Sequence, residues 1–129
     1  MKRIIIAVLC ALGLVSALDA QEKKGVMTLS SKEFKTKVYD ISAKNPEYLG
    51  SKPAIVDFYA SWCGPCRAIS PVLEELAKEY GDKIVIYKVD VDASRDIAQA
   101  FGIRSIPAVL FIPMKGEAQM TVGGRSKED

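Results

Sequence analysis

The sequence predicts an α/β protein in which helices cover both faces of a central mixed sheet. Segments with strand and helix patterns alternate along the chain in the order βα, βα, βα, ββ. Two of the strand segments are apolar almost throughout, which is typical of strands covered on both faces. The last two strand segments are joined by a short turn and are expected to pair as a hairpin. The 129 residues suffice for one domain with one core.

Composition and charge argue against several classes of function. The formal net charge is +2 and basic and acidic residues are interspersed, so neither nucleic acid nor an anionic membrane surface is indicated as a partner. The cysteines are Cys10, Cys63 and Cys66, and the sequence has no histidine. Imidazole bases and histidine metal ligands are therefore excluded, and we expect neither a metal nor a cofactor.

The N-terminus has the pattern of a secretory signal peptide. A basic pair at 2–3 precedes an apolar run at 4–15, and small residues follow at 16–20. We expect residues 1–20 to be removed as a signal peptide, which leaves residues 21–129 as the domain.

Alternatives for the same segment are an uncleaved anchor and a lipid anchor. The apolar run is shorter than the ~20 residues that span a bilayer, which argues against an uncleaved anchor. Lipidation of Cys10 is rejected because bulky Leu9 precedes it and the cysteine lies inside the run. Cleavage after Ala17 is the second choice to cleavage after Ala20. We therefore predict export, most simply to a bacterial periplasm.

The first elements of the domain are a short strand and a helix. Val26–Leu29 can form an edge strand, and Ser30 and Glu33 have the spacing of a capping box at a helix start. The buried stripe of this helix is expected to comprise Phe34, Val38 and Ile41. A loop at 45–53 leads to the next strand.

The strand at Ala54–Ala60 is almost continuously apolar but carries Asp57 in its middle. A charged carboxylate is costly to bury, so we expect Asp57 to be protonated or partnered. The alternative is a strand-edge aspartate that points at water. Two cysteines just past the strand end argue against this alternative.

A long helix is expected to begin near Cys63 and to end at Gly81. Pro65 suits its first turn, whereas Pro71 lies inside the helix and should kink it. Its buried face is expected to comprise Ile69, Val72, Leu73, Leu76, Ala77 and Tyr80.

The second half of the chain adds three strands and a short helix. Ile84–Val91 is expected to be a strand whose alternate residues face opposite sides. The short helix that follows it is expected to carry Ile97, Ala98 and Phe101. The apolar strand Ala108–Ile112 should then pair with Ala118–Val122 in a hairpin. Ser126–Asp129 resembles the first turn of a further helix.

The candidate reactive residues lie where the strand at Ala54–Ala60 meets the long helix. A thiol attacks disulfides as the thiolate, and a helix N-terminus favours that negative charge. Cys63 precedes the helix next to Trp62 and is the better nucleophile. Cys66 lies one turn in, is expected to be more buried, and would resolve a mixed disulfide. A buried carboxylate at Asp57 could accept the proton of Cys66, directly or through water.

Two cysteines at this spacing have three other possible uses. A zinc site needs about four ligands, and the mature chain offers two cysteines and no histidine. A cysteine hydrolase needs a base, usually histidine. A structural disulfide across two residues closes too small a loop to stabilise a protein much. Redox chemistry is therefore favoured.

The segment Trp62-Cys63-Gly64-Pro65-Cys66 is identical to the active-site motif of thioredoxins. The resemblance covers Val26–Asp129 and implies the thioredoxin fold. Further residues that match the family pattern are Asp57, Pro71, Lys88, Gly123 and the segment Phe101–Pro107.

The resemblance also implies a substrate groove. In thioredoxins the bond that matches Ile106–Pro107 is cis and lies against the active-site disulfide. Carried over, Ile106 and Pro107 form one wall of the groove, with Trp62 and Gly123 as others. Gly64 and Pro65, between the cysteines, belong to the same substrate-binding surface. Lys88 would lie near Asp57 and adjust its charge; the alternative for Lys88 is an exposed strand lysine.

The sequence departs from the family pattern in three places. Ala108 follows the proline where thioredoxins commonly have threonine, which removes a hydroxyl from the groove. The segment Asp40–Pro53 looks longer than in cytosolic thioredoxins. The C-terminal helix of the family would begin where Asp129 ends the sequence, so we expect a truncated last helix, exposed apolar surface and lowered stability.

The resemblance implies a protein-disulfide reductase. Gly64 and Pro65 resemble the reductants of the superfamily, whose oxidants and isomerases usually carry histidine between the cysteines. With export, the expected substrates are exported proteins with disulfides, and the expected electron source is a membrane thiol carrier. Alternatives are a net oxidant or isomerase, or a non-catalytic binding module or chaperone for thiol proteins. A monomer is expected.

Overall fold

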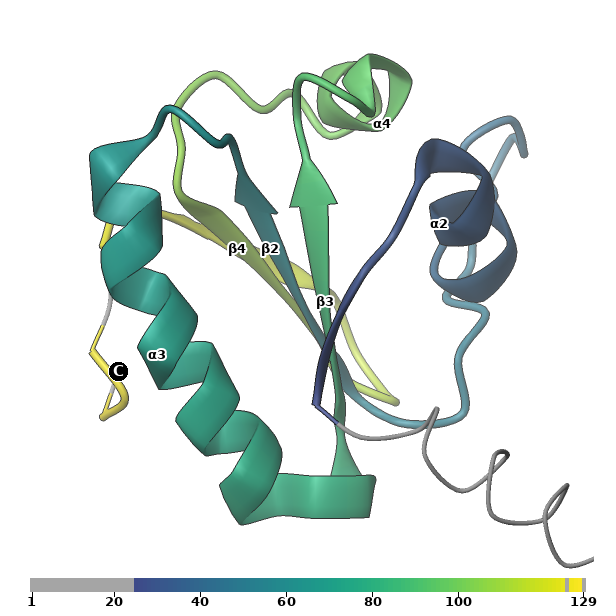
Figure 1. Cartoon of the computed structure of the whole chain (residues 1–129). Helices are drawn as coiled ribbons and strands as arrows, with labels where there is room; N and C mark the ends of the chain where they lie inside the picture. Colours follow the sequence, from purple (N-terminus) through teal and green to yellow (C-terminus); the bar gives the residue numbers. More distant parts are fainter. Residues whose placement is uncertain (1–24, 125, 129) are drawn as a thin grey trace, which may run out of the picture.

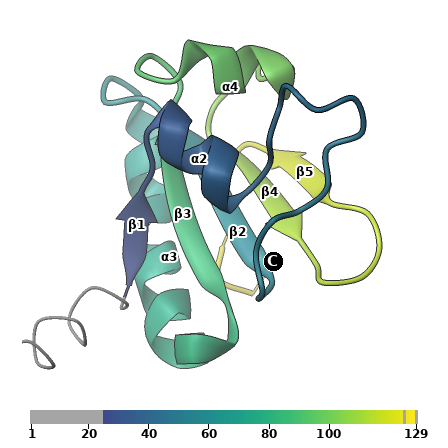
Figure 2. The same ribbon diagram turned by 90° about the vertical axis from the view of Figure 1, so that its right-hand side faces the viewer.

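A five-stranded mixed sheet forms the centre of the protein (Figures 1 and 2). The computed structural model describes residues 25–124 and 126–128, so the signal peptide expected at 1–20 lies outside the described residues. The strands are β1 (Val26–Thr28), β2 (Ala54–Tyr59), β3 (Val85–Asp90), β4 (Ala108–Ile112) and β5 (Gln119–Val122). Their order across the sheet is β1-β3-β2-β4-β5. Strand β3 pairs in parallel with β1 and β2, whereas β4 is antiparallel to β2 and β5. The expected mixed sheet is confirmed.

Helices lie on both faces of this sheet, also as expected. Helix α3 (Gly64–Tyr80) covers one face, and α2 (Ser31–Lys37) and α4 (Arg95–Ala100) lie on the other (Figure 1). A 3₁₀ turn, η1 (Gly81–Lys83), joins α3 to β3. Within the described residues, no helix has the length and apolar character needed to cross a membrane.

Helix α2 begins at the predicted capping box but ends earlier than expected. Glu33 N–H donates to Ser30 Oγ at 3.2 Å, and Ser30 N–H donates to Glu33 Oε1 at 3.1 Å. The helix stops at Lys37 because the Val38 carbonyl accepts from Leu49 N–H at 2.9 Å, so it pairs with the returning loop. Ile41 therefore lies beyond the helix, although it still packs against the core.

Helix α3 has the expected limits. Cys63 is its N-cap, Pro65 lies in its first turn, and Gly81 ends it with a φ of 53°. The helix continues through Pro71. Tyr80, expected on the buried face, is 45% exposed, since it is the last helical residue and the chain turns back toward β3 directly after it.

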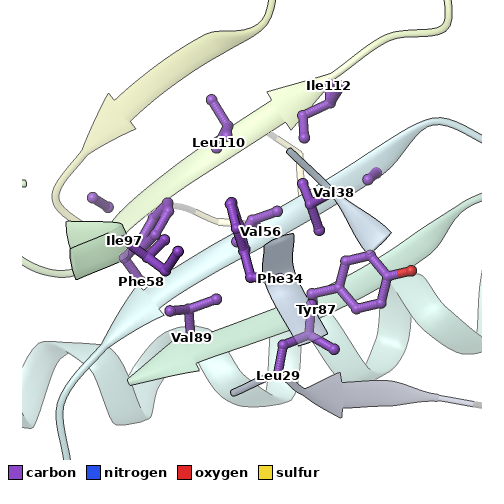
Figure 3. Packing of buried hydrophobic residues seen from close by; sticks show 12 residues of the cluster. Leu29, Phe34, Val38, Val56, Phe58, Tyr87, Val89, Ile97, Leu110 and Ile112 are labelled. Carbon is purple, nitrogen blue, oxygen red and sulfur yellow. The ribbon is translucent and has the colours of Figure 1, made fainter. Parts of the chain in front are cut away.

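The larger part of the core lies between the sheet and the α2–α4 layer (Figure 3). Alternation along the strands assigns the side chains to the two faces. Val56 and Phe58 from β2 and Tyr87 and Val89 from β3 enter this core. Its other labelled members are Leu29, Phe34, Val38, Ile97, Leu110 and Ile112. The two faces expected for β3 are thus confirmed.

The opposite face carries a smaller core under α3. Ile69 and Leu73 of α3 pack with Ile86 of β3 and Val109 of β4. Phe111 of β4 lies along the same side and is 37% exposed. Because Asp57 alternates with Val56 and Phe58, its side chain also points to the α3 face of the sheet.

The end of the chain returns to α3 (Figure 1). Lys127 Nζ lies 2.9 Å from Glu79 Oε2 and 3.9 Å from Glu75 Oε2. Residues 127–128, which resembled the start of a helix in sequence, form a turn.

Candidate active site

Cys63 and Cys66 form a disulfide at the junction of β2 and α3, with their Cα atoms 5.4 Å apart. Cys63 is the N-cap of α3, and Cys66 N–H donates to Cys63 Sγ at 3.2 Å. Unpaired N–H groups at a helix start stabilise negative charge. When the disulfide is reduced, this arrangement favours the thiolate of Cys63.

The two cysteines do not differ in burial as expected. Cys63 is 4% exposed and Cys66 is 3% exposed. Both cysteines lie in one small buried cluster with Ala60 in the oxidised protein. The asymmetry of the pair lies in the hydrogen bond to Cys63 Sγ.

The segment Ile106–Pro107 lies beside the disulfide. The Ile106–Pro107 peptide bond is cis, as the resemblance implied. Ile106 packs against the cluster that contains both cysteines, and Pro107 is fully buried. Gly123 N–H donates to the Pro107 carbonyl at 2.8 Å. The structure therefore brings Ile106, Pro107 and Gly123 together beside the disulfide.

Trp62 stands out from the surface beside the cysteines. Its side chain is 69% exposed, and its Nε1–H donates to Asp92 Oδ2 at 2.8 Å. Gly64 and Pro65 are exposed as well. Sequence reasoning missed Asp92 as a partner of Trp62. The available signal was its place just after β3, at the same edge of the sheet as the cysteines.

Asp57 is buried, and no described residue forms a hydrogen bond with its carboxylate. The residue is 0% exposed, and neither carboxylate oxygen has a hydrogen-bond partner among the described residues. Its neighbours in the strand register are Lys88 on β3 and Val109 on β4. Burial raises the pKa of Asp57 from its ordinary 3.8 to about 6, although the charge of Lys88 opposes this rise. An acid with such a pKa can exchange a proton near neutral pH.

Lys88 is partly buried and is not an exposed strand lysine. Its Nζ donates to Ser70 Oγ at 3.2 Å and lies 4.4 Å from the centroid of the Tyr59 ring. Sequence reasoning missed Ser70 and Tyr59. Ser70 lies one helical turn after Cys66 on α3, but nothing in its spacing relates it to β3.

The disulfide, Trp62 and the Ile106–Pro107 wall lie together at one edge of the sheet, and Asp57 lies within β2 on the face that α3 covers. The site combines a disulfide at a helix start, a buried carboxyl group with a raised pKa, an exposed indole and a cis proline wall. The described residues contain no cluster of three or more cysteine, histidine and acidic side chains that could hold a metal ion. The chemistry that this set of groups supports is thiol–disulfide exchange.

Comparisons with known proteins agree with this chemistry. The thioredoxin family model matches residues 25–129. A thioredoxin of Borreliella burgdorferi is 45% identical over 98 residues, which cover 75% of this chain and 84% of the relative. A chloroplastic M-type thioredoxin of Pisum sativum is 53% identical over 77 residues, which cover 59% of this chain and 44% of the relative.

A solved structure is similar as well. The crystal structure of a chloroplastic thioredoxin z superposes with a TM-score of 0.67 at 27% identity, over 81% of this chain and 86% of that chain. The fold, the active-site motif and the family model agree, and the chain therefore belongs to the thioredoxin family.

Proposed function

We propose that the protein is a thiol–disulfide oxidoreductase that reduces disulfides of exported proteins and is recharged by a thiol carrier in the membrane. The single observation that carries the oxidoreductase function is the Cys63–Cys66 disulfide at the start of α3, beside the Ile106–Pro107 wall. Membership of the thioredoxin family supports the same activity.

The first step forms a mixed disulfide. In the reduced protein, the Cys63 thiolate attacks one sulfur atom of the substrate disulfide. The substrate S–S bond breaks, a bond between Cys63 Sγ and the substrate sulfur forms, and the leaving thiolate takes a proton from solvent. The backbone of Ile106 and the exposed Trp62 side chain would contact the extended substrate segment.

The second step releases the product. The Cys66 thiol passes its proton to Asp57, directly or through water, and the resulting thiolate attacks Cys63 Sγ. The bond between Cys63 Sγ and the substrate sulfur breaks as the Cys63–Cys66 disulfide forms, and the second substrate thiolate leaves and takes a proton from Asp57 or from solvent. Two electrons have then passed from the protein to the substrate. Lys88 adjusts the charge of Asp57, because an ammonium near a carboxylate favours its ionised form.

The exported location is supported by sequence alone. The basic pair at 2–3, the apolar run at 4–15 and the small residues at 16–20 are typical of a cleaved signal. Expression in a Gram-negative bacterium tests this proposal through the mass of the mature protein in the periplasmic fraction. A chain that starts at residue 21 is expected, or at residue 18 with the second cleavage choice. Uncleaved protein in the cytosol would contradict export.

A net oxidant or isomerase is the alternative within the same chemistry. The Gly64–Pro65 pair between the cysteines favours the reductant, since it resembles that of the reducing members. A binding module or chaperone that holds thiol proteins without turnover is the alternative from another class.

Turnover separates the enzyme from the binding module. A dithiol donor and a small disulfide-linked protein are mixed with wild type or with Cys63→Ser, and reduction is followed over time. We expect many turnovers from wild type and only the background rate from Cys63→Ser. Thermal melts of both reduced proteins control for folding, because serine is nearly isosteric with cysteine. Equal rates would exclude the enzyme.

A further inference from the structure

The ammonium group of Lys88 is held by side chains other than the carboxylate that faces it. Asp57 lies opposite Lys88 in the register of β2 and β3, yet neither of its oxygens accepts a hydrogen bond from any described residue. Instead, Lys88 Nζ donates to Ser70 Oγ at 3.2 Å and lies 4.4 Å from the Tyr59 ring centroid. An aromatic face and a hydroxyl thus take the place of an ion pair.

This arrangement matters for proton transfer. A carboxylate in direct contact with an ammonium is stabilised in its charged form and becomes a weaker base. A cation held at a distance acts through space only and leaves the carboxylate oxygens open. The proton acceptor in the proposed second step needs such open oxygens, because the proton must arrive there from Cys66.

Among the described residues, Lys88 is the cation whose charge lowers the pKa of Asp57. From β4 the neighbour is Val109, which is apolar. From β2 it is Tyr59, a phenol whose pKa is raised by burial and by the charges of Asp90 and Asp57. On α3, Ser70 contacts Lys88 and is uncharged, and the Cys63–Cys66 disulfide at the start of this helix does not titrate. A change in the position of Lys88 should therefore be visible in the titration of Asp57.

We propose that Ser70 is a positioning residue whose hydroxyl holds the Lys88 ammonium over Tyr59 and away from Asp57, so that the carboxylate stays open to the proton of Cys66. The effect of Ser70 on catalysis rests on the proposed function, whereas its effect on the position of the Lys88 ammonium does not. Ser70 has the right location for this task, since it lies one turn after Cys66 on the helix that covers Asp57.

The test follows the carboxyl carbon of Asp57 by ¹³C NMR across pH in the oxidised protein. The variants are Ser70→Ala, Ser70→Thr, Lys88→Met and the double variant Ser70→Ala/Lys88→Met. In Ser70→Ala the ammonium loses its acceptor and moves onto the unpartnered carboxylate. We expect the midpoint of Asp57 to fall by about one pH unit.

The remaining variants act as controls. Ser70→Thr keeps a hydroxyl and should restore the wild-type midpoint. Lys88→Met removes the cation and should raise the midpoint, and adding Ser70→Ala to it should change nothing further. An unchanged or raised midpoint in Ser70→Ala would overturn the proposal, as would an equal effect of Ser70→Ala with and without Lys88.

A kinetic measurement connects the placement to catalysis. The rate at which Cys66 resolves a preformed mixed disulfide is measured in single turnovers across pH. Ser70→Ala should shift the acid limb of this profile to lower pH in parallel with the NMR midpoint. Because the NMR titration uses oxidised protein without substrate, a failure of the proposed enzyme activity leaves its result unaffected, so the two failures are distinguishable.

Discussion

Asp57 and Lys88 lie opposite each other on the parallel strands β2 and β3, and the Asp57 carboxylate is fully buried without a hydrogen bond from any described residue. Such a carboxylate destabilises the fold whenever it is charged. Burial also raises the pKa of Asp57 to about 6, which suits the role of proton acceptor that we propose for it near neutral pH. In the proposed mechanism, the residue that supplies the base for Cys66 is thus one whose buried charge lowers the stability of the fold.

Replacing this acid should stabilise the protein in a pH-dependent way. The pKa of Asp57 is about 6 in the folded protein, above its ordinary 3.8. The folded state thus binds more protons than the unfolded state between these values, and stability falls as pH rises through this window. The side chain of the Asp57→Asn variant cannot ionise. The free energy of unfolding of this variant, taken relative to wild type, should therefore be roughly 3 kcal/mol higher at pH 7.5 than at pH 3.

Urea unfolding at the two pH values measures this gain. Asp82→Asn, at an exposed position in the 3₁₀ turn, is the matched control and should show little change between the two. A difference between Asp57→Asn and wild type that is the same at both pH values would contradict the buried charge.

The resolving role that we propose for Cys66 predicts a trapped intermediate. Without the second thiol, the mixed disulfide between Cys63 and the substrate cannot be released. Cys66→Ser should therefore accumulate a covalent adduct, visible as a mass increase equal to the substrate and removed by excess dithiol. The double variant Cys63→Ser/Cys66→Ser should form none. An adduct that persists in the double variant would place the reactive group elsewhere.

The hydrogen bond from Trp62 to Asp92 predicts a binding defect. Asp92→Ala removes the acceptor that holds the exposed indole, at a net loss of ~1 kcal/mol. Because the indole would contact substrate rather than the reacting atoms, KM should rise about fivefold with little change in kcat. Asp92→Asn retains an acceptor oxygen and is the matched control. A fall in kcat at constant KM would assign Asp92 a different role.

Two phenylalanines on opposite faces of the sheet predict unequal losses of stability. Phe34 is 0% exposed and lies edge-on to Phe101, with ring centroids 5.6 Å apart. Phe34→Ala should lower the free energy of unfolding by about 3–5 kcal/mol. Phe111 is 37% exposed on the α3 side, so Phe111→Ala should lower the free energy of unfolding by less than half as much. Denaturant unfolding of both variants decides, and equal losses would contradict the assigned core.

Most of the fold could be predicted from local sequence patterns. The apolar run at Ala108–Ile112, bounded by turn residues, matches β4 at both ends. The capping box at Ser30 is present as expected, because it depends on residues close in sequence. The early end of α2 was not predictable, since it depends on a hydrogen bond from Leu49, far along the loop. The exposure of Tyr80 similarly depends on where the sheet lies, which helical spacing does not report.

Site residues that belong to a sequence motif could be predicted. Contacts between side chains that are distant in sequence could not. The cysteines and Asp57 could be chosen from spacing and burial pattern, and the cis bond before Pro107 only from the family resemblance. The contacts of Lys88 with Ser70 and of Trp62 with Asp92 each join residues from different elements. Their sequence separations follow no short-range rule, so only the folded arrangement reveals them.

The central claim is that Cys63 and Cys66 form a reversible couple that donates electrons to protein disulfides. The most direct test is a redox titration of this couple in glutathione or dithiothreitol buffers, read by mass after alkylation. A reductant should titrate at about −270 mV, the value typical of thioredoxin, and Cys66→Ser should show no two-electron transition. A midpoint of about −120 mV, typical of a dedicated oxidant, or a pair that stays oxidised throughout, would contradict the claim.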